Sequence, residues 1–399
     1  MMVTAHERFL NGRPGGKRAS LRFLDMSGLD LAGRDLTDAD LSASILNGCR
    51  LIRTKLERAN LFGCDLRKAD LRLANLRRAD VRGCCLRGAN LSQADLTQAD
   101  FREGQIAIPH PRKGLDMIRH EARAGDAEGA NFSGATLDGS MMNGASAFAA
   151  DFTDCSLKGA KLTGANLKDA KLSGAILEGA DVSGTNFEGA NLSGAVLTGV
   201  NTSLARMSGA RTDQCLREPS AEALLRVPQL EAMVDGNQAW CTTGGKSGSP
   251  ARFDGEDLRP LAEKLKGSRL TAMSAKGACL VGLNLTGVQM QGANLEGADL
   301  RGALLVKADL RGAKMAGANL TKADLRGACF GVLPLGPGRS NPTTLNQAQL
   351  RYATAQAADL TSAILDGADL RGADLTGARM EQMSLRDADV TSTIGLDAQ

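Results

Sequence analysis

The sequence predicts an all-β solenoid, in which short strands coil around one axis. The first of three observations is a run of apolar residues at every fifth position, from Leu21 through Leu36 to Ile106, without exception at eighteen positions. Since 43% of all residues are apolar, chance would give such a run roughly once in a few million sequences, so an internal repeat is the first hypothesis. The chain is therefore expected to grow by repetition rather than as several globular domains.

The five-residue spacing is the second observation, because it excludes the regular structures. On an α-helix, a step of five residues rotates each apolar side chain by about 140° from the previous one, so no face stays apolar. On a straight strand, an odd step places successive side chains on opposite faces. Only a chain that bends once in each repeat keeps all of these side chains inside.

The third observation is the composition of the quintets, which shows where the chain bends. In residues 89–93 and 180–184 the order is small apolar, Asp or Asn, large apolar, polar, and then often Gly. The first four positions alternate between inside and outside as in a short strand, and the fifth breaks this alternation. We therefore predict a corner at the fifth position, where glycine adopts unusual dihedral angles without a Cβ penalty. Glycine stands there at Gly28, Gly33, Gly83, Gly164, Gly174, Gly194 and Gly297.

This pattern resembles the pentapeptide repeat, whose signature is Ala, Asp or Asn, Leu and two variable residues. Residues 69–71, 165–167, 298–300 and 373–375 match it almost verbatim. The resemblance implies a right-handed quadrilateral β-helix with four repeats in each coil. It also implies a function, since the family is best known for topoisomerase protection, in which an acidic rod resembles DNA and occupies the DNA site of gyrase.

Breaks in the five-residue phase divide the chain into two solenoid segments in tandem, with short helical caps and inserts. We expect an N-terminal cap (1–18), segment 1a (19–107), a loop and short-helix insert (108–130), segment 1b (131–213), a helical linker with a second cap (214–250), segment 2a (251–332), a Pro/Gly loop (333–344), segment 2b (345–392) and a tail (393–399). In the insert, a short helix is expected at 115–123. In the linker, helices are expected at 219–225 and 231–240.

The two caps are predicted from an internal echo. Residues 6–12 lead through a glycine turn into the first repeat at Leu21, and residues 237–241 lead through Gly244 and Gly245 into the repeat at Phe253. Each combines a short helix, one aromatic residue and a turn. Repeat proteins need such caps for solubility. The sole tryptophan, Trp240, is expected to be buried in the second cap.

The sequence offers no catalytic arrangement. Four cysteines (Cys49, Cys64, Cys84 and Cys155) occupy the small inward position and are expected to be reduced structural thiols. Cys64 and Cys84 should stack in adjacent coils, so a disulfide between them is the alternative. The three histidines show no metal-ligand spacing, and no Ser/His/Asp pattern is present. We expect no enzyme, no cofactor and no metal.

The first solenoid is basic, although the formal net charge of the chain is only +3. Eleven Lys or Arg and four acidic residues lie between Arg50 and Arg87. Twenty-residue stacking would align Arg67 with Arg87, and Arg82 with Arg102. Such columns could contact phosphates. They could equally be the solvated exterior of the rod, and the spread of charge over all four faces favours the second interpretation.

The expected function is therefore a non-enzymatic scaffold, a rigid rod in the cytoplasm that binds an unknown protein partner through outward residues and inserted loops. The alternatives are a DNA-mimicking gyrase protection protein, which the positive charge disfavours, and a nucleic-acid-binding rod using residues 50–87. No stretch is long and apolar enough for a membrane span. The last coil has no capping helix, so a homodimer through it is a further hypothesis. The candidate partner-binding residues are Arg67, Arg78, Arg82, Arg87, His110, Arg112, Lys113 and Trp240, together with residues 333–341.

Overall fold

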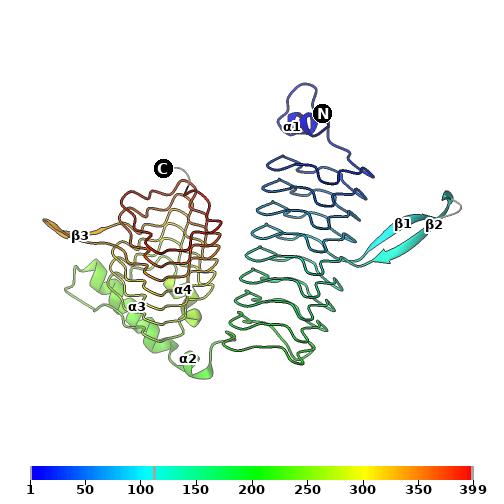
Figure 1. Cartoon of the computed structure of the whole chain (residues 1–399). Coiled ribbons are helices and arrows are strands. Elements are labelled where there is room, and N and C mark those ends of the chain that lie inside the picture. Colours follow the sequence, from blue (N-terminus) through cyan, green and yellow to red (C-terminus); the bar gives the residue numbers. More distant parts are fainter. Residues whose placement is uncertain (1, 111–113, 397–399) are drawn as a thin grey trace. The chain divides into compact units, whose positions relative to one another are not determined.

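A computed structural model describes residues 2–110 and 114–396 of the chain. The chain divides into two units, Met1–Glu218 and Pro219–Gln399. In each unit the backbone winds through a stack of short coils, and two hairpins and the helices other than the short helical turn at residues 259–265 stand outside the coils (Figure 1). Each unit has its own apolar core.

The coils are held together by single parallel bridges between residues twenty positions apart, such as Asp40 with Asn60 and Asn60 with Asp80. The N–H of Leu41 donates to the carbonyl of Asn60 over 2.8 Å, and the N–H of Asn60 donates to the carbonyl of Ala39 over 2.9 Å. One coil therefore holds four quintets, and each quintet contributes one residue to the ladder on its side. These ladder positions are the Asp and Asn positions of the repeat.

The predicted core and corner positions are found where the pattern placed them. Leucines such as Leu41, Leu61 and Leu320 are fully buried, and so are the alanines two positions before them. All seven glycines predicted at corners have φ between 62° and 70°. Other residues adopt the same left-handed conformation, for example Arg58 and Lys68. The backbone therefore bends at the fifth position whether or not it carries glycine.

The first unit begins with helix α1 (Met2–Leu10) and is interrupted once, by an antiparallel hairpin of strands β1 (Gly104–His110) and β2 (Gly114–Arg123). The bridged residues Asp80 and Asp100 are 20 positions apart, whereas Asp100 and Met141 are 41 apart. The hairpin therefore adds 21 residues to one coil. This is why the five-residue phase shifts by one residue across the insert.

The structure corrects the expected boundaries of this insert. Residues 115–123 lie in strand β2 rather than in a helix, and Ile106 lies in β1 rather than in a coil. The coils resume at Asp126, which bridges to Cys85, and not at residue 131. Pairing with β1 decides the conformation of β2, and a pattern read over nine residues contains no information about such a partner.

The second unit begins with α2 (Ala221–Leu225) and α3 (Val227–Thr242). The hydroxyl of Ser220 caps α2 by accepting a hydrogen bond from the N–H of Ala223. Within the first coil, a 3-10 turn η1 (Arg259–Leu261) and helix α4 (Ala262–Leu265) replace one quintet. The sequence predicted no helix within segment 2a (251–332), so this helical turn is a difference from the prediction. The turn adds two residues, since Arg252 bridges to Ser274, 22 positions later.

The expected loop at 333–344 is a second hairpin, β3 (Leu333–Gly336) with β4 (Arg339–Asn341). Lys314 bridges to Thr344, 30 positions later, so this insert adds ten residues, or two quintets, and the phase is kept. The side-chain amide of Asn341 donates to the carbonyl of Gly312 over 2.9 Å. A Cβ at Gly312 would lie 2.6 Å from Cβ of Leu333. The hairpin is therefore packed closely against the coil it leaves.

Inward Ser, Thr and Cys side chains bond one coil to the next. The thiol of Cys64 donates to the carbonyl of Leu41 over 3.0 Å, and that of Cys84 to the carbonyl of Leu61 over 2.8 Å. All nine cysteines are free, so the alternative of a disulfide between Cys64 and Cys84 is not realised. Burial raises the pKa of the Cys84 thiol. These cysteines are structural donors in place of alanine.

Candidate interaction surfaces

The candidate arginines do not form one basic surface. Arg67 and Arg87 lie on the same side of adjacent coils, because Asp65 bridges to Cys85 two positions before each of them. Arg72 and Arg82, however, belong to other quintets of the same winding and therefore to other sides. The basic segment thus wraps around the coils.

Most of this positive charge is already paired with carboxylates. Arg67 donates from Nε to Oδ1 of Asp65 over 2.8 Å, and Arg82 donates from Nη2 to Oδ2 of Asp80 over 2.7 Å. The Arg67 guanidinium holds the pKa of the Asp65 carboxyl below its usual range. Eight of the eleven basic residues between positions 50 and 87 form such ion pairs, namely Arg50, Lys55, Arg58, Arg67, Arg72, Arg77, Arg82 and Arg87.

The pairing follows a spacing that is visible in the sequence, Asp, any residue, Arg. The carboxylate accepts from both the side chain and the backbone N–H of the arginine two positions later. We call this combination of ion pair and backbone hydrogen bond an Asp–Arg clip. It occurs at Asp65–Arg67, Asp70–Arg72, Asp80–Arg82, Asp100–Arg102, Asp257–Arg259, Asp299–Arg301, Asp309–Arg311, Asp324–Arg326 and Asp369–Arg371. Counting lysines and arginines missed this signal, and the count overstated the positive surface.

Arg78 differs from the other candidates. It stands at a corner with φ of 55°, and its Nε donates to Oε1 of Gln98 over 2.9 Å. On the side of the coils that carries Arg67 and Arg87, these two residues, Arg123 and Cys85 line a shallow pocket of 470 Å³. Asp65 and Asp126 complete its lining, so opposite charges meet within the pocket.

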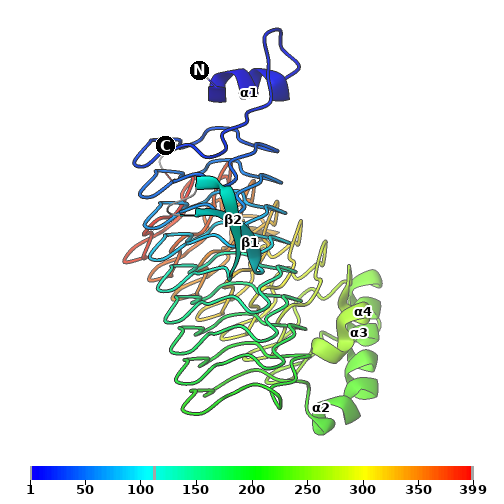
Figure 2. The same ribbon diagram turned by 90° about the vertical axis from the view of Figure 1, so that its right-hand side faces the viewer.

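The β1–β2 hairpin is the largest element outside the coils of the first unit (Figure 2). Gly104 fixes its base, because a Cβ there would lie 2.7 Å from the ring of Phe62. The guanidinium of the candidate Arg82 lies 5.5 Å from the centroid of the same ring. His110 ends strand β1, whereas Arg112 and Lys113 lie outside the described residues.

Trp240 is half-buried rather than buried as expected. Helix α3 packs on the first coil of the second unit through Leu230, Val234 and Asn237, which follow the i, i+4, i+7 spacing of one helix face. Trp240 is three residues beyond Asn237 and lies at the side of this face. Its indole nitrogen approaches Gly245, where an added Cβ would be 3.4 Å away.

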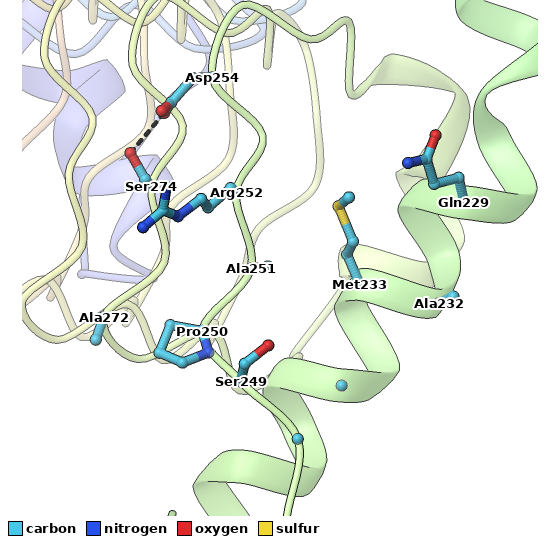
Figure 3. Close-up of a pocket in the computed structure, with 12 residues that line it drawn as sticks. Gln229, Ala232, Met233, Ser249, Pro250, Ala251, Arg252, Asp254, Ala272 and Ser274 are labelled. Carbon is cyan, nitrogen blue, oxygen red and sulfur yellow. Dashed lines mark hydrogen bonds between the residues drawn. The ribbon is translucent and has the colours of Figure 1, made fainter.

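Residues of α3 and of the first coil of the second unit line a groove of 840 Å³ (Figure 3). Gln229 and Met233 line it from the helix, and Arg252 and Asp254 from the coil. Asp254 accepts hydrogen bonds from the hydroxyl of Ser274 and the N–H of Lys276, and the Ser274 bond is the main cause of its lowered pKa. The lining of the groove also includes Ser249 and contains no His or Cys. The shape of this groove depends on how α3 packs against the coil, and the sequence alone did not predict that packing.

Comparison with known proteins decides the family. A family model of pentapeptide repeats matches the chain in eight copies, and the matched residues include 35–72, 74–106, 150–189, 175–211, 293–331, 344–382 and 356–391. These ranges cover more than half of the sequence. The chain belongs to the pentapeptide repeat family.

Solved structures of pentapeptide repeat proteins are similar to this chain. Rfr23 from the cyanobacterium Cyanothece 51142 is 33% identical, with 35% of this chain and 91% of Rfr23 covered and a TM-score of 0.26. HetL from Nostoc sp. strain PCC 7120, which is involved in heterocyst differentiation regulation, is 21% identical over 98% of this chain and 96% of HetL, with a TM-score of 0.15. QnrB1, a plasmid-mediated fluoroquinolone resistance protein, is 17% identical over 52% of this chain and 97% of QnrB1, with a TM-score of 0.25. A search of curated proteins gave no match.

Two further features of this pentapeptide repeat protein concern the residues that the structure describes. Across residues 2–110 and 114–396, His, Cys, Asp and Glu side chains nowhere gather in a group of three or more that could hold a metal ion. Over the same ranges, each helix is too short or too polar to cross a bilayer.

Proposed function

We propose that this pentapeptide repeat protein is a non-enzymatic, cytoplasmic scaffold that binds a protein partner through its two inserted hairpins. We also infer, from the family, that both coil stacks are right-handed quadrilateral β-helices arranged as two solenoid segments in tandem. The observation that carries the proposal is that each hairpin leaves and re-enters the coils without disturbing their pairing. A hairpin of this kind adds surface and changes the core little.

The hairpins have the features of a recognition element on a rigid support. The coils around the first hairpin pair in register on both sides, with Asp80 on Asp100 and Asp126 on Ser146. An isolated two-stranded hairpin has two outer edges whose backbone groups are available to a partner. Loops on rigid scaffolds are frequent carriers of binding residues.

The two alternative functions have weaker support. A mimic of DNA should be strongly negative, and the formal net charge of this chain is +3. A nucleic-acid-binding rod needs basic groups that can release counterions on binding. Eight of the eleven basic residues between positions 50 and 87 already form ion pairs with carboxylates of the same chain. We therefore expect neither activity to be the main one.

Self-association through the C-terminal coil is a second proposal. In the last coil, Met383 and Leu385 are only partly buried against the core and Val390 is 40% exposed. A second copy of the chain could cover these partly exposed apolar side chains. The molecular mass in solution at micromolar concentration tests this proposal, and a monomeric mass would remove it.

The scaffold proposal is tested with two excision variants that keep the coil spacing, one lacking residues 104–124 and one lacking 333–342. Proteins captured from a lysate of the source organism are quantified for the intact chain and both variants. We expect at least one captured protein to fall about tenfold or more with one excision while the circular dichroism of the variant stays that of the intact chain. Equal capture by all three forms would contradict the proposal.

The alternatives are tested on the same preparations. Duplex DNA is titrated at low and moderate salt against the intact chain and against charge reversals at Arg67, Arg78 and Arg87. Strong binding that salt weakens and the reversals abolish would favour the nucleic-acid alternative over the scaffold. Protection of gyrase supercoiling from a fluoroquinolone would favour the topoisomerase alternative.

A further inference from the structure

The first winding of the first unit is partly covered by α1, which a buried histidine anchors (Figure 2). His6 is fully buried. Its Nδ1 lies 3.1 Å from the amide nitrogen of Ala19, and its Nε2 lies 2.9 Å from the carbonyl oxygen of Thr37. The guanidinium of Arg34 donates two hydrogen bonds of 2.8 Å to Glu7 of α1. The helix thus covers two of the four sides of this winding, those of Ala19 and Arg34.

The second unit has a larger cap with an equivalent anchor. Asn237 on α3 is fully buried. Its Oδ1 accepts from the N–H of Ala251 over 2.8 Å, and its Nδ2 donates to the carbonyl of Thr271 over 3.2 Å. Helix α3 has 16 residues and α1 has nine, which correspond to lengths of about 24 and 14 Å. Leu230 of α3 is also buried in the core, whereas His6 is the one buried residue of α1. The cap of the first unit therefore closes less of its winding.

The residue two positions before each inward Leu-type residue shows what closes a winding at its N-terminal side. In the second winding of the first unit, Ser44 donates to the carbonyl of Leu21, and Cys49 donates to that of Met26 over 2.8 Å. Both acceptors belong to the first winding, so these side chains are directed towards the winding before them. They are 1% and 0% exposed. A side chain at this small position is therefore closed by whatever precedes its winding.

Two small positions of the first winding are open. Leu24 and Leu29 stand twenty positions before Ser44 and Cys49, and they are 39% and 49% exposed. No winding of the described chain precedes them, and α1 covers the other two sides. The end of the first unit thus has a raised half, residues 2–18 with α1, and a lower half, residues 22–31 with both leucines.

Large side chains at the small position mark a covered surface in the second unit. In its second winding, Met273 and Leu283 stand at this position and are only 1% and 4% exposed. They belong to the core that also contains Leu230 of α3 and Leu261 of the turn η1. Between two regular windings, a leucine in the place of alanine would overfill the core. The leucines of the lower half thus have the signature of a surface covered by helical segments rather than by another winding.

Phe23 adds an exposed aromatic ring to the lower half. It stands at a corner with φ of 57° and is 77% exposed. A left-handed backbone is unfavourable for a residue with a side chain, and so little burial within the unit does not compensate for it. The next two corners of the same column carry the small residues Ala43 and Gly63. An exposed aromatic residue at a strained position indicates contact with another molecule.

The two halves carry opposite charge. The raised half has four basic residues and one acidic residue, Glu7, which is already in an ion pair. The lower half exposes Asp25 and Asp30, and its one basic residue, Arg22, lies 3.6 Å from Asp40. The basic residues of the raised half are all exposed and are Arg8, Arg13, Lys17 and Arg18. The end of the first unit is therefore complementary, in height and in charge, to a second copy of itself.

We propose that two copies of this chain associate through these N-terminal ends, with the raised half of each copy on the lower half of the other. A two-fold axis relates the same surface on both copies, so each α1 covers Leu24 and Leu29 of the other copy. An α-helix with its side chains is about 10 Å thick, so the two α1 helices lie in one layer between the two first windings. The arrangement also brings the basic residues of each raised half to Asp25 and Asp30. It involves neither the inserted hairpins nor the C-terminal coil.

Sedimentation equilibrium of the full chain at micromolar concentrations tests this proposal. We expect the natural chain to associate, and Val390→Asp, which changes the C-terminal coil, should still dimerise. Adding Leu24→Asp and Leu29→Asp should raise the dissociation constant about tenfold or more, with unchanged circular dichroism. A monomeric natural chain, a monomeric Val390→Asp variant, or a dimer that the leucine changes leave intact would overturn the proposal.

The corner at Phe23 offers a matched pair of variants. Phe23→Gly and Ala43→Gly both place glycine at a left-handed corner of the same column, where it is well suited, so both variants should fold. Only Phe23→Gly should raise the dissociation constant, because only this corner lies at the end of the unit. Equal dissociation constants for the two variants would contradict the proposed arrangement.

Charge reversal tests which halves meet. One variant combines Asp25→Lys with Asp30→Lys, and the other combines Arg8→Glu with Arg13→Glu. Each alone should dimerise weakly, because its two halves then carry the same charge. An equimolar mixture should recover the dimer, because each half again meets a half of opposite charge. A mixture that associates no better than the separate variants would overturn the contact between raised and lower halves.

Discussion

The two units build the same coil and close its first winding with different side chains. In the first unit, the anchor is the imidazole of His6, and in the second it is the amide of Asn237. Both offer one acceptor and one donor to backbone groups in the first winding. The comparison teaches that a cap anchor is defined by this pair of bonds and not by residue type.

The units differ also in what interrupts them. The first accommodates 21 extra residues, and the second accommodates ten in one coil and two in another. The number 21 is not a multiple of five, yet pairing resumes undisturbed. What matters is that the chain re-enters at the position in the quintet that it would have reached without the insert. Gly125 takes the small position, and a Cβ there would lie 2.3 Å from the carbonyl oxygen of Phe101.

The largest expected effect sharpens the comparison of the two cores. Leu71→Ala in the first unit and Leu300→Ala in the second remove fully buried side chains, and each should cost about 2–5 kcal/mol in the free energy of unfolding. Because the cores are separate, denaturant unfolding followed by hydrogen exchange should show each change in its own unit. The exposed Leu335 is the control, and Leu335→Ala should have little effect. Equal destabilisation of both units by either core variant would contradict two separate cores.

The second prediction concerns the anchors. His6→Ala and Asn237→Ala each leave two backbone groups of the first winding without their partner, which should cost about 1–3 kcal/mol of docking free energy. Exchange protection of residues 2–19 and 227–251 measures the two losses separately. At pH 7.5 the losses should be similar. A loss in only one of the two caps would show that the anchors are not equivalent.

The repeats were predictable from the sequence, because each inward side chain is set by its own quintet. The position of Leu61 in the core and the bend at Gly83 follow from five residues of local pattern. The echo between residues 6–12 and 237–241 was also visible, although the alignment of His6 with Asn237 gained its meaning only from the hydrogen bonds. Such regularity arises because each coil repeats the environment of the one before.

The inserts and the charge pattern were harder to predict. Strand β2 depends on pairing with β1, and the turn at η1 and α4 depends on packing against α3, so a short window of sequence could not assign either. Trp240 lies at the side of the buried face of α3. Which residues near the end of a helix are buried depends on how the helix packs, and this could not be read from the sequence. The pairing of Arg67 with Asp65 was readable, since the two residues are two positions apart, but only the strand geometry shows that this spacing closes an ion pair.

The third prediction tests whether the coils need the chain to re-enter at the right position of the quintet. Deletion of residues 104–124 removes 21 residues, brings Asp100 and Met141 to a separation of 20, and should leave the first unit folded. Deletion of residues 104–123 removes one residue fewer and shifts every later leucine out of phase. We expect the second variant to be less stable than the first by about 1–3 kcal/mol, as for other local packing errors. Thermal unfolding compares the two, and equal stability would show that the coils absorb a stray residue freely.

The smallest effects concern the Asp–Arg clips, and here the units again differ. The side chain of Arg72, paired with Asp70, is 47% exposed, whereas that of Arg301, paired with Asp299, is 11% exposed. Asp70→Asn should cost less than about 1 kcal/mol, because Asn still accepts from the backbone N–H two positions later, as Asn75 does for Arg77. Asp299→Asn should cost more, since it leaves a largely buried guanidinium without its carboxylate.

The pH dependence of the Asp70–Arg72 clip follows from the direction in which the pKa of Asp70 is shifted. The Arg72 guanidinium lowers the pKa of Asp70 in the folded chain, so the unfolded chain binds this proton more readily. The stabilisation is therefore complete above about pH 4, the ordinary range of an aspartate, and is lost as the pH falls through the lower folded value. Denaturant unfolding of the natural protein and of Asp70→Asn should differ at pH 7 and converge at low pH. A difference that persists after Asp70 is protonated would mean that shape rather than charge makes the clip.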